Sequence, residues 1–392
     1  MARVVLMVVR KRFGLSPASN KPPPSEPEPG QYRYPIKKVS VEGDPVWVSV
    51  PQVDTISIVG NLLPEHFVSG YEVEASEQYG QRLMSSLASG KLGLVAGKPK
   101  YHSNIYWQVS VLLGEPAVAI NFSLGKAKGD VVHWFRLEFN PNALGHTGTL
   151  DLLDGIHLAT DKTFRIGRFL QDARVSRIDV AIDVVGLTVP DIIVSAVNEG
   201  KRVLYHGEDG ILETVYVHRK SKAKTASSGK HVKLPALILR LYDKGRELSS
   251  RSLPAMFGET PVTRLEITKV RFGNAKFTPA QLGGLRNVFS AVRTNESRAT
   301  AFNRWIWLEY VSLRRSGGHG WASQLLALSP EEGPAFDAAY TSFPSDLINP
   351  KDVWAFWERG LKLAGCDLLS LAAEAGSSAS HITDHIGFFT DP

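Results

Sequence analysis

The chain has 392 residues, of which 43% are hydrophobic and 21% charged, the composition of a soluble globular protein with room for two or three domains. Its single cysteine, Cys366, excludes an internal disulfide framework and a cysteine-rich zinc site, and it suits a reducing compartment. The apolar run at residues 4–9 is too short to span a bilayer, so we expect a cytoplasmic protein without a membrane partner. The net charge of +6 is a weak hint of a polyanionic partner.

The chain begins with a basic segment, residues 1–40, whose proline-rich stretch at 21–29 predicts a disordered, extended linker. A helix-like stretch follows at residues 62–93. Strand-like segments occur at residues 46–50, 55–59, 104–113, 117–122, 131–139, 176–185, 214–218, 237–242 and 263–270. Helix-like segments then dominate, at residues 280–292, 304–314, 324–328 and 350–371. We therefore predict an α+β fold, with a catalytic core over residues 41–275 built on an antiparallel or mixed β-sheet with interspersed helices, and a helical C-terminal region over residues 276–392.

Four of the predicted strands share one pattern, in which an arginine and an apolar residue precede a residue that could do chemistry. The copies are Arg136-Leu137-Glu138, Arg177-Ile178-Asp179, Arg240-Leu241-Tyr242 and Arg264-Leu265-Glu266. Because side chains alternate between the faces of a strand, the arginine and the third residue share one face. Three acids and a tyrosine presented in this way predict a metal-assisted site with a covalent nucleophile, and we infer Glu138, Asp179 and Glu266 as the metal ligands.

A second acid, Asp183, lies on the same predicted strand and face as Asp179. Four residues of extended chain separate their Cα atoms by roughly 13 Å, whereas metal–oxygen bonds are only about 2.0–2.6 Å long. An unbent strand therefore cannot easily direct both carboxylates at one ion. We expect Asp179 to be the ligand, with Asp183 as a supporting or alternative one.

The tyrosine strand places Arg240, Tyr242 and Lys244 on one face if the strand continues that far. A free tyrosine has a pKa near 10, so forming the phenolate at neutral pH costs about 4 kcal/mol. Two flanking cations and a nearby divalent ion would reduce that cost, and the same cations would bind a phosphate. Tyr205 and Tyr216 lack such flanking cations.

The segment around Tyr242 is the most basic part of the chain. Residues 201–251 contain twelve Lys or Arg against five Asp or Glu, a net charge of +7. So many charges are difficult to bury, which predicts a long exposed hairpin or loop before the tyrosine strand. The basic residues expected to contact a polyanionic partner are Arg219, Lys220, Lys222, Lys224, Lys230 and Lys233.

Together these segments resemble the replication initiation factors of rolling-circle plasmids and filamentous phages. The similar segments are 176–183, 214–217, 240–247 and 263–266, in the same order as in that family. The resemblance implies an enzyme that binds a double-strand origin and nicks one strand through a tyrosine, which stays attached to the 5′ phosphate until the ends are rejoined. It implies Tyr242 as the nucleophile, Arg240 and Lys244 as phosphate clamps, and Mg²⁺ or Mn²⁺ as the cofactor.

The same resemblance implies double-stranded origin DNA and single-stranded DNA as ligands, in the cytoplasm of a bacterial host. A host polymerase would extend the released 3′ end. Residues 93–99 do not form a P-loop, so unwinding would need a host helicase. A homodimer is left open.

Several alternatives remain at this stage. The repeated pattern also fits a ladder of Arg–carboxylate pairs, each worth about 0.2–1 kcal/mol, and Tyr242 also fits a packed structural tyrosine. A non-catalytic origin-binding or regulatory protein would use the same basic residues. A tyrosine recombinase is the third candidate because His133 and Arg136 form an HxxR string, but this string runs into a strand far from Tyr242.

Overall fold

The computed structural model describes residues 33–40, 44–68, 76–97, 107–126, 133–196, 199–219, 223–225, 231–233, 238–251, 257–270, 277–296, 304–341, 347–368 and 370–372. The proline-rich lead-in lies outside these residues. Within them, no helix has the length and apolar character needed to cross a membrane.

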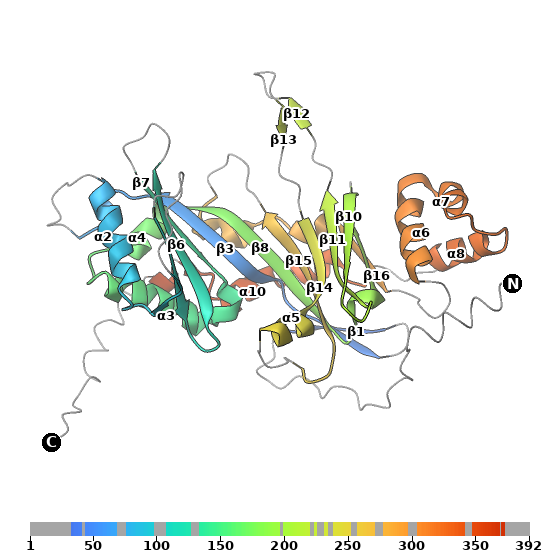
Figure 1. Ribbon diagram of the computed structural model, residues 1–392, viewed down its shortest axis with the longest axis horizontal. Coiled ribbons are helices and arrows are strands. Elements are labelled where there is room, and N and C mark those ends of the chain that lie inside the picture. The colour runs from blue at the N-terminus through green and yellow to red at the C-terminus, as the bar shows by residue number, and fades with distance from the viewer. Residues whose placement is uncertain are drawn as a thin grey trace.

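A large sheet runs through the described part of the chain (Figure 1), and its strand order is β10-β11-β14-β15-β8-β3-β7-β6-β5-β4. Strand β2 pairs with the last two residues of β8, next to the part of β8 that pairs with β3. Strand β1 pairs with β2. Every pairing is antiparallel, which confirms the predicted α+β class. The twelve strands are β1 (Ile36–Val39), β2 (Pro45–Val48), β3 (Gln52–Asn61), β4 (Leu94–Val95), β5 (Trp107–Leu113), β6 (Val118–Lys126), β7 (His133–Phe139), β8 (Arg174–Val185), β10 (Glu199–His206), β11 (Leu212–Arg219), β14 (Ile238–Asp243) and β15 (Val262–Val270).

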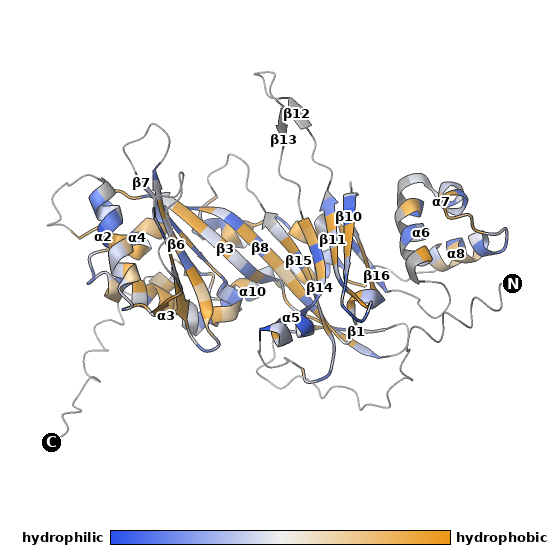
Figure 2. Ribbon diagram, viewed as in Figure 1, coloured by the Kyte–Doolittle hydropathy of each residue, from blue (hydrophilic) through white to orange (hydrophobic). Residues whose placement is uncertain are grey.

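The sheet has one apolar and one polar face because apolar and polar residues alternate along its strands (Figure 2). In β7, for example, Phe135, Leu137 and Phe139 are buried, whereas Arg136 and Glu138 between them are only half-buried. Fully burying one such apolar side chain contributes about 1.5–3 kcal/mol relative to leaving it exposed. The apolar face therefore carries the main core.

Helices cover the apolar face at the β3–β7 side of the sheet. Helix α2 (Ser76–Ala88) contacts β5, β6 and β7, and three further helices contact β3: α3 (Pro141–Ala159), α4 (Ile166–Asp172) and α10 (Trp357–Leu363). Helix α3 begins at Asn140, whose side chain accepts a hydrogen bond from the backbone N–H of Ala143 (2.9 Å). Its sequence did not predict a helix, because glycines interrupt the apolar pattern and Gly145 has a positive φ of 70°.

Behind the other half of the sheet lies a two-stranded sheet of β9 (Ile192–Ala196) and β16 (Val292–Glu296). The helix predicted at residues 280–292 is wrong. Instead, Pro279–Gly284 and Val288–Ala291 form the short 3-10 helices η3 and η4. The Gly283-Gly284 pair disfavours a continuous helix, and β-branched Val292 and Thr294 favour the strand that follows.

The predicted C-terminal region is divided between two cores. Helices α6 (Arg304–Gly317), α7 (His319–Leu325) and α8 (Glu332–Thr341) pack around Trp307, Tyr310 and Phe336, together with Ile193 of β9. Beyond them, helix α9 (Pro350–Trp354), capped by Asn349, and helix α10 belong to the main core. The boundary predicted at residue 275 therefore does not mark the edge of that core.

Three short helices and a hairpin complete the described elements. Helix α5 (Lys244–Ser250) follows β14, while η1 (Pro64–His66) and η2 (Val189–Asp191) are single 3-10 turns. Within the basic segment, β12 (Ala223–Thr225) and β13 (His231–Lys233) pair as an antiparallel hairpin, in agreement with the predicted hairpin. Figure 1 shows this hairpin at one end of β11 and β14, apart from the large sheet.

The close approach of α10 to β3 gives a test of the C-terminal packing. A Cβ atom on Gly360 would lie 1.8 Å from the backbone oxygen of Pro51, and the indole of Trp357 on the same helix donates a hydrogen bond to Leu282 (2.8 Å). We expect Gly360→Ala to lower the free energy of unfolding by about 2 kcal/mol or more, although alanine favours helix by about 1 kcal/mol.

Urea denaturation measures this change. The matched control is Gly320→Ala in α7, where nothing lies within 4 Å of the added methyl group. That variant should be neutral or slightly stabilised. Equal stabilities of the two variants would contradict the packing of α10 on the sheet.

Candidate functional site

Part of the predicted site comes together on the polar face of the sheet. Across β14, β15 and β8, Tyr242 pairs with Arg264 and Arg264 pairs with Asp183. One pleat further along, Arg240 pairs with Glu266, which in turn pairs with Ala181. This register confirms that the arginine and the third residue share a face in the Arg240 and Arg264 motifs.

Arg264 lies at the centre of the site and is almost fully buried. Its Nε and Nη2 atoms donate to the two carboxylate oxygens of Asp183 (2.6 and 2.9 Å), and Nη1 donates to Asp54 (2.6 Å). Gln52 donates to the same Asp183 carboxylate (3.2 Å). Burial alone would raise the pKa of Asp183, but the Arg264 charge and hydrogen bonds, with Lys244 and Gln52, hold that pKa below its ordinary value.

Asp183 is therefore committed to the guanidinium of Arg264, and its predicted role as an alternative metal ligand needs correction. If the Asp183 carboxylate turned away from Arg264 to bind a metal ion, the buried guanidinium would lose its partner, at a cost of about 3–5 kcal/mol. Asp179 binds a different partner, because Arg177 donates to it from Nε (3.1 Å) and Nη2. The two aspartates thus have separate partners, as the strand geometry indicated.

The three acids predicted as metal ligands do not form a compact group. Glu266 accepts a long hydrogen bond from Arg240 (3.4 Å), and Asp179 is paired with Arg177. Glu138 is on β7, which is separated from β8 by β3, and it lies opposite Ser57 of β3. In the part of the chain that the structure describes, no three His, Cys, Asp or Glu side chains are placed to hold one metal ion. The ligand assignment stays a prediction.

Glu266 differs from Asp183 because its pKa is raised rather than lowered. Its side chain is 3% exposed, and burial, followed by the Asp54 charge, raises its pKa from 4.5 to about 7. Arg240 acts in the opposite direction, and Asp179 adds to the increase. A carboxyl group of this kind can exchange a proton near neutral pH, and its acidic neighbours would also favour an added cation.

Tyr242 is buried, with only 6% of its surface exposed. Burial is the main reason that its pKa lies above the ordinary value of 10; Arg264 lowers the pKa, while Asp54 and Glu266 raise it. The Arg240 guanidinium carbon lies 4.6 Å from the centroid of the Tyr242 ring. The flanking cations alone therefore do not bring the pKa of the phenol below its ordinary value, and the sequence argument called for a divalent ion as well.

Lys244 is not part of the tyrosine strand, which corrects its predicted placement. Strand β14 ends at Asp243, whose carboxylate accepts a hydrogen bond from the backbone N–H of Arg246 (2.9 Å) and so begins helix α5. Lys244 is the first residue of that helix and forms an ion pair with Glu247. Its charge still contributes to the low pKa of Asp183, so it lies near this end of the site.

The structure says less about the residues predicted to bind DNA. Lys220, Lys222 and Lys230 lie outside the described residues. In the strand register, the backbone of Arg219 lies opposite Glu199 at the end of β11. In the hairpin, Lys224 lies opposite Val232 and Lys233 opposite Ala223. Their contacts with DNA stay a prediction.

Sequence reasoning missed Asp54, Gln52 and the structural role of Arg264. The register of β3 against β8 shifts between Val53 and Thr55, so Asp54 lies at an irregularity that simple alternation does not predict. Arg264 belonged to the repeated pattern, but only the pairing of β15 with β8 shows its partner.

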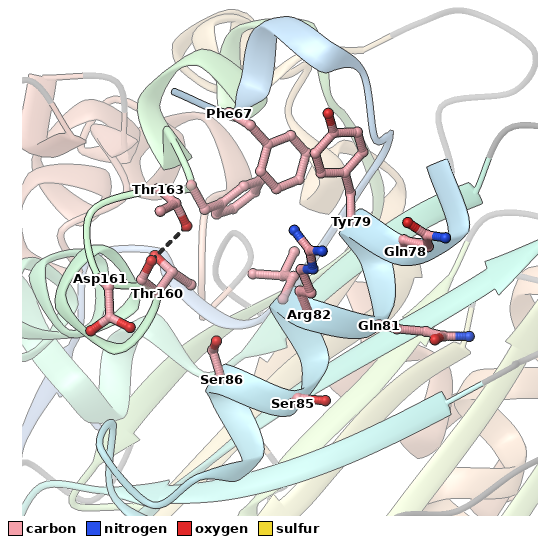
Figure 3. Close-up of a pocket in the computed structure, with 12 residues that line it drawn as sticks. Phe67, Gln78, Tyr79, Gln81, Arg82, Ser85, Ser86, Thr160, Asp161 and Thr163 are labelled. Carbon is pink, nitrogen blue, oxygen red and sulfur yellow. Dashed lines mark hydrogen bonds between the residues drawn. The ribbon is translucent and has the colours of Figure 1, made fainter. Parts of the chain in front are cut away.

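A pocket of about 450 Å³ lies elsewhere, between α2 and the turn that joins α3 to α4 (Figure 3). Its lining includes Phe67, Tyr79, Arg82, Thr160 and Asp161. Because α2 and α3 pack on the apolar face, the sheet separates this pocket from Tyr242.

Comparison of the chain with the models of known protein families finds no match, and no curated protein matches it. The likeness to replication initiation factors therefore depends on the motifs quoted above.

The raised pKa of Glu266 predicts a pH dependence of stability. Below pH 4.5 the group is protonated in both states, but between about pH 4.5 and 7 the folded protein binds the proton more tightly than the unfolded chain. Stability therefore falls as the pH rises through this range, by about 3 kcal/mol for this one group. We expect Glu266→Gln to remove that part of the loss.

Urea denaturation at pH 5 and pH 8 measures the effect as a difference between wild type and variant, so that other titrating groups cancel. Glu65→Gln, at an exposed position in η1, is the control. If Glu266→Gln has the same pH dependence as wild type, the buried acid does not titrate near neutral pH.

Proposed function

We propose that the chain is a DNA strand-nicking and joining enzyme of the rolling-circle initiation kind, with Tyr242 as its nucleophile. The observation that carries the proposal is the pairing of Tyr242 with Arg264 on the polar face, beside Glu266 with its pKa of about 7. A nucleophile, a group that can take its proton and one partly exposed arginine for phosphate, Arg240, thus lie on two adjacent strands.

The proposed reaction follows from these groups. The Tyr242 hydroxyl oxygen attacks the scissile phosphorus and its proton passes to the ionised Glu266 carboxylate. The bond to the 3′ oxygen breaks, that oxygen takes a proton from solvent to become a 3′ hydroxyl, and Glu266 releases its proton to solvent. The product is a 5′-phosphotyrosine. Arg240 stabilises the charge that develops on the phosphate. Attack by a 3′ hydroxyl on the phosphotyrosine reverses the step and joins the strand.

A divalent cation fits the donors of this site, although the described residues do not hold them in an assembled shell. Of the predicted ligands, Glu266 and Asp179 would hold Mg²⁺ or Mn²⁺, and Asp54 would take the place of Glu138, because Asp54 and Asp179 are the acids whose charges raise the pKa of Glu266. Such an ion supplies charge stabilisation for the phosphate.

The burial of Tyr242 favours a second candidate, an origin-binding protein that does not cut DNA. A phenol that is 6% exposed and held protonated by burial is also what a structural tyrosine looks like. The two functions differ in one respect: the enzyme requires DNA binding to expose the hydroxyl, whereas the non-catalytic protein leaves it buried.

The first test is formation of a covalent adduct. The full chain is incubated with Mg²⁺ and a supercoiled plasmid carrying the origin of the element that encodes it. We expect nicked circles with protein on the 5′ end, and we expect Tyr242→Phe to lower the adduct yield at least about 1,000-fold because the attacking oxygen is lost. Gel analysis and mapping of the labelled peptide measure the result.

Tyr340→Phe in α8 is the matched control, since that tyrosine belongs to the separate helical core. Binding without nicking across several metals would support the non-catalytic protein. An adduct that survives in Tyr242→Phe and disappears in Tyr216→Phe would move the nucleophile to the neighbouring strand.

The metal assignment has its own test, independent of activity. Mn²⁺ should raise the melting temperature of wild type at pH 8, because a cation relieves the repulsion among Glu266, Asp54 and Asp179. We expect Glu266→Gln to lose most of this shift, measured by differential scanning calorimetry. An unchanged shift in the variant would remove Glu266 from the ligand set.

A further inference from the structure

An aromatic and cationic row extends from Tyr242 to the edge of the sheet. Tyr216 on β11 pairs with Arg240 on β14, and the Arg240 guanidinium carbon lies 5.4 Å from the centroid of the Tyr216 ring. The same carbon lies 4.6 Å from the centroid of the Tyr242 ring, so one guanidinium lies against two tyrosines. The ring centroids of Tyr205 on β10 and Tyr216 are 5.5 Å apart in an edge-to-face arrangement.

The outer end of this row is open. Tyr205 is 55% exposed, whereas Tyr242 at the inner end is 6% exposed. An aromatic ring that stays exposed on an edge strand contributes little hydrophobic stabilisation to the fold. Its exposure is therefore better evidence of a binding role than the presence of a buried ring. The row thus leads from a solvent-exposed ring to the proposed nucleophile across three adjacent strands.

The charges along the row suit an anionic ligand. The Arg240 side chain is one-third exposed, and its Nε has no hydrogen-bond partner among the described residues. Two acids near the outer end, Asp209 and Glu213, both form ion pairs with Arg246 of helix α5. Arg246 therefore neutralises Asp209 and Glu213, whereas Glu208, three residues after Tyr205, is exposed.

We propose that Tyr205, Tyr216 and Arg240 form a stacking platform for the bases of single-stranded DNA. The proposal deepens the proposed function, since it says how the strand would be held on one side of Tyr242. Aromatic rings and guanidinium planes stack on unpaired bases of any sequence, while the same arginine reaches a phosphate. A duplex offers no free base faces, so the platform selects the opened strand.

Equilibrium binding tests the platform without any cleavage. Fluorescence anisotropy of the full chain in EDTA, at constant salt, compares a labelled oligothymidylate with a duplex of equal length. We expect Tyr205→Ala to weaken single-strand binding about tenfold, the loss of one base–aromatic stack, and to change duplex binding less than twofold. Tyr205→Phe keeps the ring and should restore wild-type affinity.

Trp321→Ala is the matched control, because Trp321 is an aromatic residue of similar exposure, 43%, on α7. Its affinity for both DNAs should equal that of wild type. The platform is overturned if Tyr205→Ala binds single strands as wild type does, if it loses duplex affinity equally, or if single-stranded RNA binds more tightly than DNA.

The platform and the nicking activity can fail separately. Loss of single-strand affinity in Tyr205→Ala, in a wild-type protein that never forms an adduct, would keep the platform and overturn the enzyme. A covalent adduct on Tyr242 combined with unchanged binding by Tyr205→Ala would keep the enzyme and overturn the platform.

Discussion

The buried guanidinium of Arg264 is the interaction on which the polar side of this protein depends. An arginine removed from water must be neutralised and hydrogen-bonded, and here Asp183 of β8 and Asp54 of β3 do both. These contacts join three strands that are distant in sequence. They also constrain the register of β15 against β8, and β15 in turn positions Tyr242 through the pairing of Tyr242 with Arg264.

The sheet can hold these buried charges because its apolar face packs in the hydrophobic core and its polar face carries the charged groups. The apolar face provides the hydrophobic stabilisation, with rings such as Phe122, Phe135 and Phe139 buried beneath the helices. That stabilisation allows the other face to hold groups that are costly to bury. Glu266 illustrates the cost, because its pKa of about 7 shows that the folded protein disfavours its ionised form.

The charged groups around Tyr242 are arranged as competing pairs rather than as one preformed shell. Arg177 binds Asp179, Arg240 reaches Glu266, and Lys244 binds Glu247. A phosphate would draw on the arginines and a cation on the acids, so a bound substrate would exchange these partners. For the proposed enzyme this means that the protein alone holds the phenol protonated, and that ligand binding would have to supply the activation.

The α+β class, most of the strands of the large sheet and the common face of the Arg-apolar-X motifs on β8, β14 and β15 could be predicted from the sequence. Those features are local, because a period of two in hydrophobicity decides which side chains point together. The sequence also showed that Asp179 and Asp183 could not easily share an ion. The helix predicted at residues 280–292 failed because two glycines and β-branched residues outweighed its apolar pattern.

Only the tertiary structure decided which partner each charged residue has. The pairing of Arg264 with Asp183 depends on strand order, the contribution of Asp54 depends on a register shift in β3, and the burial of Tyr242 depends on how completely its neighbours pack around it. These are long-range properties, set by contacts between distant segments, such as Arg264 and Asp54, which are 210 residues apart. Local alternation can place a side chain on a face, but it contains no information about what lies across from it.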